Sequence, residues 1–128
     1  MLILLYTQNV LLAQSIQNET KPLETILACS HARRIPNLIR LNKPSAVALD
    51  ISNPLLEGPT LLKEIQRVNP KIPIIVMASH TQLELIESLF RWGAQSYLAL
   101  PCHAARIMKR LREASDNISE EKKEPAWV

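Results

Sequence analysis

The residue best placed to do chemistry is Asp50, which ends the apolar run Ala46-Val47-Ala48-Leu49. Short apolar runs bounded by turn residues are typical of buried strands in parallel sheets. In open α/β sheets, ligands and reacting groups lie just beyond the carboxyl ends of the strands. Asp50 is therefore a candidate functional carboxylate, although Asp is also common as a capping or turn residue.

The histidines and cysteines do not have the spacing of a metal site. His31 and His103 lie close in sequence to Cys29 and Cys102, whereas His80 has no such neighbour. Isolated histidines are usually capping or surface residues, and unpaired cysteines in such a chain are usually buried and reduced. We therefore expect no metal ligands and no catalytic residue among them.

The composition is that of an ordinary globular domain, with 128 residues, 47% hydrophobic and 21% charged. A formal charge of +3 is too small to indicate a nucleic-acid partner by itself. The apolar start of the chain has no preceding basic region and is too short for a signal peptide or a membrane span. We expect a cytoplasmic protein that does not insert into membranes.

The elements that would position Asp50 alternate between strand and helix. Hydrophobic runs predict strands at 2–6, 23–29, 45–50, 72–78 and 95–100. Helical spacing, caps and breakers predict helices at 10–19, 36–42, 58–69, 81–93 and from 101 onwards. Such alternation indicates a doubly wound (βα)5 domain with a flavodoxin-like parallel sheet of order 2-1-3-4-5, covering 1–114. The polar segment 115–128, including Trp127, is expected to be a flexible tail or frayed helix end.

Three segments resemble the receiver domain of bacterial two-component response regulators, the CheY-like family. They are Leu49–Gly58, Ile74–Ser79 and Trp92–Pro101, in the family's order and at compatible spacing. The resemblance covers roughly Met1 to Ala114. It implies that Asp50 corresponds to the aspartate that accepts a phosphoryl group from a histidine kinase. That reaction needs a divalent cation to neutralise the transferring group.

The positions that surround this aspartate in the family have lost their charge or hydroxyl group. Thr7 and Gln8 stand where the family has an acidic pair, so a weak Mg²⁺ site is the most that we expect. Ala78 replaces the hydroxyl residue that ends the fourth strand, and Leu100 replaces the lysine that binds phosphoryl oxygens. Ser79 is adjacent to Ala78, but side chains alternate between the faces of a strand, so we do not expect it to substitute.

Two further features bear on signalling. Tyr97 corresponds to the family's switch aromatic, and we expect its coupling to Asp50 to be broken, with a fixed packed tyrosine as the alternative. The last helix carries Arg106, Lys109 and Arg110, together with Arg112. These cations could form a solvated helix face. Receivers bind partners through this helix with the fourth helix and fifth strand, so an acidic protein partner is slightly favoured over none, and phosphate-backbone binding ranks third.

The sequence thus predicts a receiver-like module of the two-component phosphorelay type that binds a protein without obligatory phosphorylation. That partner would be a histidine kinase or an effector domain, and homodimerisation stays open. The first alternative is a working phosphoacceptor that is phosphorylated at Asp50. A third is a small-molecule-binding pseudo-receiver that uses the neutral pocket. We expect no enzymatic activity beyond residual autophosphotransfer and no resident cofactor.

Overall fold

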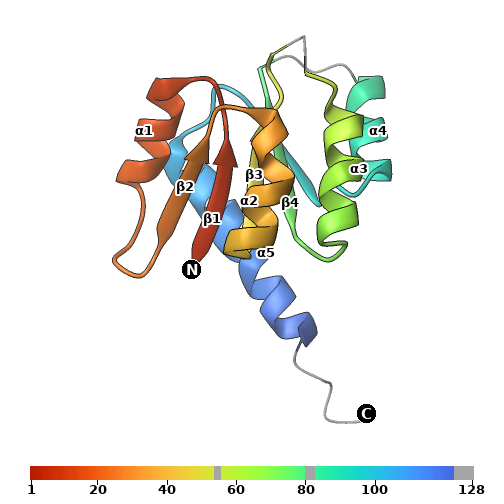
Figure 1. Cartoon of the computed structure of the whole chain (residues 1–128). Helices are drawn as coiled ribbons and strands as arrows, with labels where there is room; N and C mark the ends of the chain where they lie inside the picture. Colours follow the sequence, from red (N-terminus) through yellow and green to blue (C-terminus); the bar gives the residue numbers. More distant parts are fainter. Residues whose placement is uncertain (54–55, 80–82, 123–128) are drawn as a thin grey trace.

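The predicted strands form one parallel sheet, which a computed structural model shows with helices on both faces (Figure 1). The structure describes residues 1–53, 56–79 and 83–122. Within them, five strands have the order β2-β1-β3-β4-β5, which confirms the predicted fold class. These ranges leave out the start of the predicted helix 81–93 at Thr81, and also His80 and Trp127.

The elements have the following bounds. The strands are β1 (Leu2–Tyr6), β2 (Thr25–Cys29), β3 (Ala46–Asp50), β4 (Ile74–Ala78) and β5 (Ser96–Ala99). The helices are α1 (Val10–Asn18), α2 (Ile35–Asn42), α3 (Gly58–Val68), α4 (Leu83–Arg91) and α5 (Ala104–Lys122), with a 3-10 turn, η1 (Ala32–Arg34), before α2.

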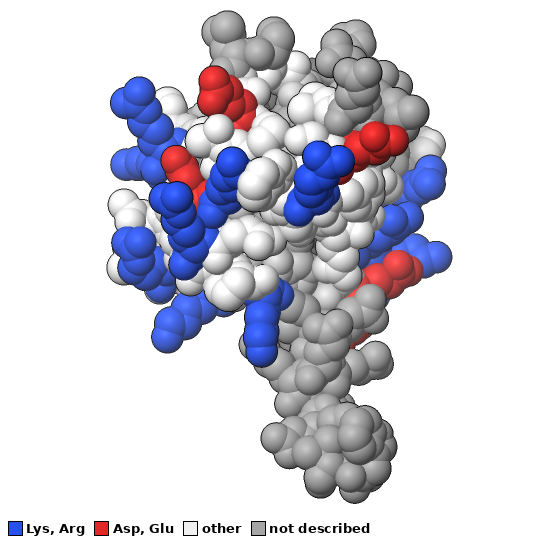
Figure 2. Space-filling view, turned by 90° about the vertical axis from the view of Figure 1, so that its right-hand side faces the viewer, with Lys and Arg blue, Asp and Glu red and all other residues white. Residues whose placement is uncertain are grey.

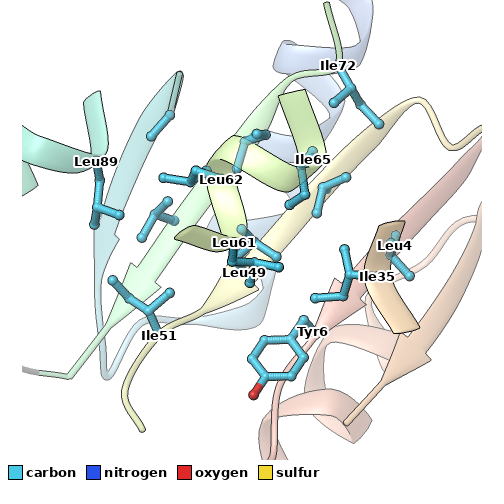
Figure 3. Packing of buried hydrophobic residues seen from close by; sticks show 14 of the residues in the cluster. Leu4, Tyr6, Ile35, Leu49, Ile51, Leu61, Leu62, Ile65, Ile72 and Leu89 are labelled. Carbon is cyan, nitrogen blue, oxygen red and sulfur yellow. The ribbon is translucent and has the colours of Figure 1, made fainter. Parts of the chain in front are cut away.

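Side chains that alternate along the central strands build two cores. Leu4 and Leu49 belong to the core beneath α2, α3 and α4, part of which is seen in Figure 3. Ile3 and Ala48 belong to the core beneath α1 and α5. Every residue of β3 and β4 is buried, which is why both read as continuous apolar runs in the sequence. Asp50 is the one charged residue in these two strands, at the carboxyl end of β3.

Several predicted boundaries were wrong by a few residues. The second strand begins at Thr25, because Leu23 belongs to the preceding turn and is exposed. Pro101 does not start the last helix, which begins at Ala104, with the His103 carbonyl accepting bonds from the first turn. That helix also continues past Ala114 to Lys122. Neither Gly nor Pro interrupts 115–122, so the polarity of this segment did not mark a helix end. A flexible tail beyond 122 stays a prediction.

A charged clamp attaches α5 to the start of β2. The Arg112 guanidinium donates from Nε to Glu24 Oε2 at 2.7 Å and from Nη2 to Glu24 Oε1 at 2.8 Å. The same Nη2 donates to the Glu19 carbonyl at 2.9 Å. The hydrogen bonds from Arg112 lower the pKa of Glu24 from 4.5 to about 2, since they stabilise the charged carboxylate. Arg112 thus serves the fold and is not free to serve a partner surface.

No helix in the described part of the chain is both long and apolar enough to cross a membrane.

Candidate functional site

A cleft of about 620 Å³ lies where β1, β3 and β4 end, at the edge of the sheet where ligands of α/β folds bind. Asp50, Ser52 and Ser79 are among its polar lining residues. Its apolar lining residues include Leu12 from α1 and Leu100 from the segment after β5. Asp50 is only 8% exposed, and its carboxylate needs hydrogen-bond donors within the protein.

Three hydrogen bonds from neutral donors satisfy the Asp50 carboxylate. Thr7 Oγ1 donates to Oδ2 at 2.7 Å. The Ser52 backbone N–H and Oγ donate to Oδ1 at 3.0 Å and 2.6 Å. The parallel register pairs Tyr6 with Leu49, and this places the next residue of each chain segment, Thr7 and Asp50, side by side. Asp50 therefore has a structural role in this loop cluster.

A second set of bonds fixes the donors themselves. Thr7 Oγ1 accepts the Asn9 N–H at 3.0 Å, and Ser52 Oγ accepts the Ser79 N–H at 3.1 Å. The loops after β1, β3 and β4 are thus joined through hydroxyl groups that donate to Asp50 and accept from the backbone. Asn53 Nδ2 also donates to Gln8 Oε1 at 3.2 Å, and this bond links the loops after β3 and β1 nearer the solvent.

The charge of the cleft rests on Asp50 alone. Among the described residues that line it, none besides Asp50 is acidic and none is basic. Thr7 and Gln8 both reach the site, but they provide neutral oxygens. Leu100 lines the cleft with an aliphatic side chain where the family resemblance implies a lysine. In the part of the chain that the structure describes, no three His, Cys, Asp or Glu side chains form a metal-binding group.

The two residues at the end of β4 occupy different environments. Ala78 is buried in the core beneath α2, α3 and α4. Ser79, which follows the end of β4, lines the cleft. That its hydroxyl does not substitute for the one missing at Ala78 stays a prediction. The Ser79 backbone N–H, bonded to Ser52 Oγ, is its recorded link to the site.

Two tyrosines lie near the site, and only one of them, Tyr97, was a candidate in the sequence analysis. Tyr97 is half-buried against the same core as Ala78, and its hydroxyl donates to the Ala78 carbonyl at 3.5 Å. Whether it is fixed there stays a prediction. Tyr6, the last residue of the predicted strand 2–6, also borders the cleft. Burial raises the pKa of Tyr6, and the nearby Asp50 carboxylate raises it further.

Among the remaining candidates, Cys102 lines the same cleft as Asp50. Cys29 is buried and donates from Sγ to the His31 carbonyl at 3.1 Å, while Cys102 is half-buried beside His103. Both thiols are free. On α5, Arg106 and Lys109 are exposed.

Arg110 differs from these neighbours on α5. It is half-buried and donates from Nη1 to Ser96 Oγ of β5 at 2.6 Å, so part of the predicted partner surface is used within the fold.

Comparison with known proteins places this geometry in a family. Residues 7–112 match the response regulator receiver domain, and the chain belongs to that family. The DNA-binding transcriptional regulator NtrC of Proteus hauseri is 27% identical over 95 residues, which are 74% of this chain and 20% of that protein. LuxO of Vibrio campbellii is 30% identical over 71 residues, 56% of this chain and 16% of that protein. The chain thus spans about a fifth or less of the length of these relatives.

Solved receiver domains share the fold. A CheY-like receiver from Methanospirillum hungatei has a TM-score of 0.84 at 19% identity, over 94% of this chain and 97% of that one. The receiver of a LuxO repressor protein from Vibrio parahaemolyticus has a TM-score of 0.84 at 22% identity, over 94% of each chain. The receiver of the sensor kinase PA1611 from Pseudomonas aeruginosa, with magnesium coordinated in its active-site cleft, has a TM-score of 0.76 at 20% identity, over 90% of this chain and 97% of that one.

Proposed function

We propose that this receiver domain is a pseudo-receiver, a signalling module that binds a protein partner whether or not Asp50 is phosphorylated. The observation that carries the proposal is the set of neutral donors around Asp50. Thr7 and Ser52 occupy both carboxylate oxygens, in a cleft whose other described lining residues are uncharged.

Phosphoryl transfer to a carboxylate depends on cations that offset the negative charge of the reacting groups. Mg²⁺ prefers several hard oxygen ligands and gives up its water reluctantly. The one carboxylate already accepts three hydrogen bonds from Thr7 and Ser52, which leaves about one of its lone pairs for a metal ion. Leu100 also leaves the transferring oxygens without a cationic side chain.

A module of this kind would act through its surface. The exposed cations Arg106 and Lys109 of α5 support an acidic protein partner, either a histidine kinase or an effector domain. Tyr97, which is bonded to the Ala78 carbonyl, would keep the neighbouring surface of β5 in one conformation. The partner would then recognise a fixed surface.

Acetyl phosphate tests this proposal. Wild-type protein incubated with acetyl phosphate and Mg²⁺ should show no mass gain by intact mass spectrometry under native-like conditions. The variant Thr7→Asp/Gln8→Asp/Leu100→Lys restores two anions and one cation around Asp50 and serves as the positive control. A stoichiometric mass gain in wild type that Asp50→Asn abolishes would make the protein a working phosphoacceptor and overturn the proposal.

A second function is supported by the shape of the cleft. Its volume of about 620 Å³ falls in the range of small-molecule sites, and Leu11, Leu12 and Leu100 give it an apolar wall. A ligand with an apolar body and hydrogen-bonding groups would suit that wall and the polar side at Ser52. An NMR fragment screen tests this second function, with Leu12→Ala as the control. Fragments that bind the Leu12→Ala variant as tightly as wild type would contradict it.

A further inference from the structure

A second hollow lies at the opposite edge of the sheet from Asp50. It has a volume of about 570 Å³ and lies between the ends of α2 and α3. These helices lead into the starts of β3 and β4, whereas Asp50 ends β3. We call it the basic groove and define it by its cations Arg40, Lys43 and Arg67 and by Ile39 and Val68.

The basic groove is charged with one sign. Among the described residues that line it, Arg40, Lys43 and Arg67 are cationic and none is acidic. All three side chains are exposed, and Arg40 donates to a neutral acceptor, Asn37 Oδ1, at 2.8 Å. Figure 2, which views the molecule from the side of α3 and α4, shows more Lys and Arg than Asp and Glu side chains on that face.

Cations at helix ends often serve only to offset the helix dipole. Two features of the basic groove go beyond that. The cations converge from two helices on one hollow, and Lys43 has a φ of 47°, in the left-handed region that favours Gly or Asn. The Lys43 N–H caps α2 by donating to the Ile39 carbonyl at 2.9 Å. A lysine therefore stands where a glycine would be less strained, which keeps a third positive charge at the hollow.

We propose that the basic groove binds an acidic segment of a partner protein. Arginine forks can hold carboxylates through two parallel hydrogen bonds, and lysine adds a point charge. The partly buried Val68 and the buried Ile39 provide an apolar floor for the stems of Glu or Asp side chains. The lining holds no aromatic residue on which nucleobases could stack, which favours a polypeptide over a nucleic acid.

This site is independent of the proposed function. Neither the state of Asp50 nor the surface of α5 contributes to it, so either proposal can fail without the other. The two surfaces also predict different sensitive residues, which one experiment can separate.

The probe is a fluorescein-labelled hexaglutamate peptide, followed by fluorescence anisotropy at low ionic strength. Arg40→Gln/Arg67→Gln should weaken its binding at least about tenfold, because both forks are lost. Arg33→Gln/Arg34→Gln is the matched control, because it removes the same charge from η1, at the other end of α2, and should change the affinity less than about threefold. Arg106→Gln/Lys109→Gln shows whether the peptide binds at α5 instead. Thermal melts check that all three variants fold, and amide shifts of wild type should map to residues 39–44 and 67–69. A labelled hexathymidylate should bind more weakly than the peptide.

Four results would overturn the proposal. They are equal weakening by the groove variant and the Arg33→Gln/Arg34→Gln control, loss of binding confined to the α5 variant, tighter binding of hexathymidylate, and no peptide binding by wild type at about 1 mM. The first would show that only net charge matters, the second would place the binding site on α5, and the third would favour a nucleic-acid backbone as the ligand.

Discussion

Replacing Asp50 by alanine should destabilise this domain, whereas replacing it by asparagine should do so much less. Alanine removes the acceptor of three hydrogen bonds and leaves Thr7 Oγ1 and both Ser52 donors without it. Asparagine keeps an oxygen that can accept from Ser52 and an amide group that can donate to Thr7 Oγ1. The comparison thus separates the hydrogen-bond network from the negative charge.

The magnitude follows from the number of bonds and the burial of the charge. A hydrogen bond to a charged group contributes about 1.5–3 kcal/mol, and the desolvation of a carboxylate that is 8% exposed offsets part of the sum. We expect a loss of about 2–4 kcal/mol in the free energy of unfolding for Asp50→Ala. Asp50→Asn should cost less than about 1.5 kcal/mol, because charge assistance is lost but the bonds are retained.

Urea denaturation followed by far-ultraviolet circular dichroism measures both differences, with equal slopes as the check on two-state behaviour. Thr7→Val is the matched control, since it removes one of the three bonds to Asp50 together with the bond that Thr7 Oγ1 accepts from the Asn9 N–H, and it should cost about 1.5–3 kcal/mol. If Asp50→Ala were as stable as wild type or more stable, the carboxylate would be a strained functional charge. The account of a structurally satisfied Asp50 would then be wrong.

Two further predictions concern other parts of the fold. The clamp between Glu24 and Arg112 stabilises the domain above the unfolded pKa of Glu24, near 4.5, and its contribution is lost as the pH falls through the folded pKa of about 2. Glu24→Gln should lower the free energy of unfolding by about 1–2 kcal/mol at pH 7, a value discounted for the solvent around the pair. The difference from wild type should shrink towards pH 2, and a difference that did not change with pH would contradict this prediction. Gly93→Ala should cost about 1–3 kcal/mol by urea denaturation, because Gly93 has a φ of 106° and Gln66 occupies the space for a Cβ; an unchanged midpoint would contradict it.

The sequence predicted the sheet and the place of Asp50 because these follow from local patterns. Continuous apolar runs in β3 and β4 indicate strands buried on both faces, and helices between them require parallel crossovers. Asp50 and Leu100 could be placed at strand ends for the same reason. The predicted start of a helix at residue 10 is also confirmed, because Asn9 caps α1 and its Oδ1 accepts the Leu12 N–H.

The bonds around Asp50 were not predictable in the same way. The Ser52 N–H bonds to Asp50 Oδ1 in the local pattern of an Asx turn, in agreement with the alternative that Asp50 is a turn residue. The second bond, from the Ser52 hydroxyl, has no such local signal. The contact of Thr7 with Asp50 depends on the register between β1 and β3. The Glu24–Arg112 clamp joins residues 88 positions apart, and such pairs follow from tertiary packing alone.

The central claim is that the cleft has too little negative charge to bind Mg²⁺ well, and a paired NMR titration tests it most directly. With Mg²⁺ added to about 10 mM, amide shifts of wild type at Thr7, Gln8 and Asp50 should not saturate, because one carboxylate faces a doubly charged and strongly hydrated ion. The variant Thr7→Asp/Gln8→Asp should saturate at about millimolar Mg²⁺ or below, since it restores two carboxylates. Saturable sub-millimolar binding by wild type at these three residues would contradict the account.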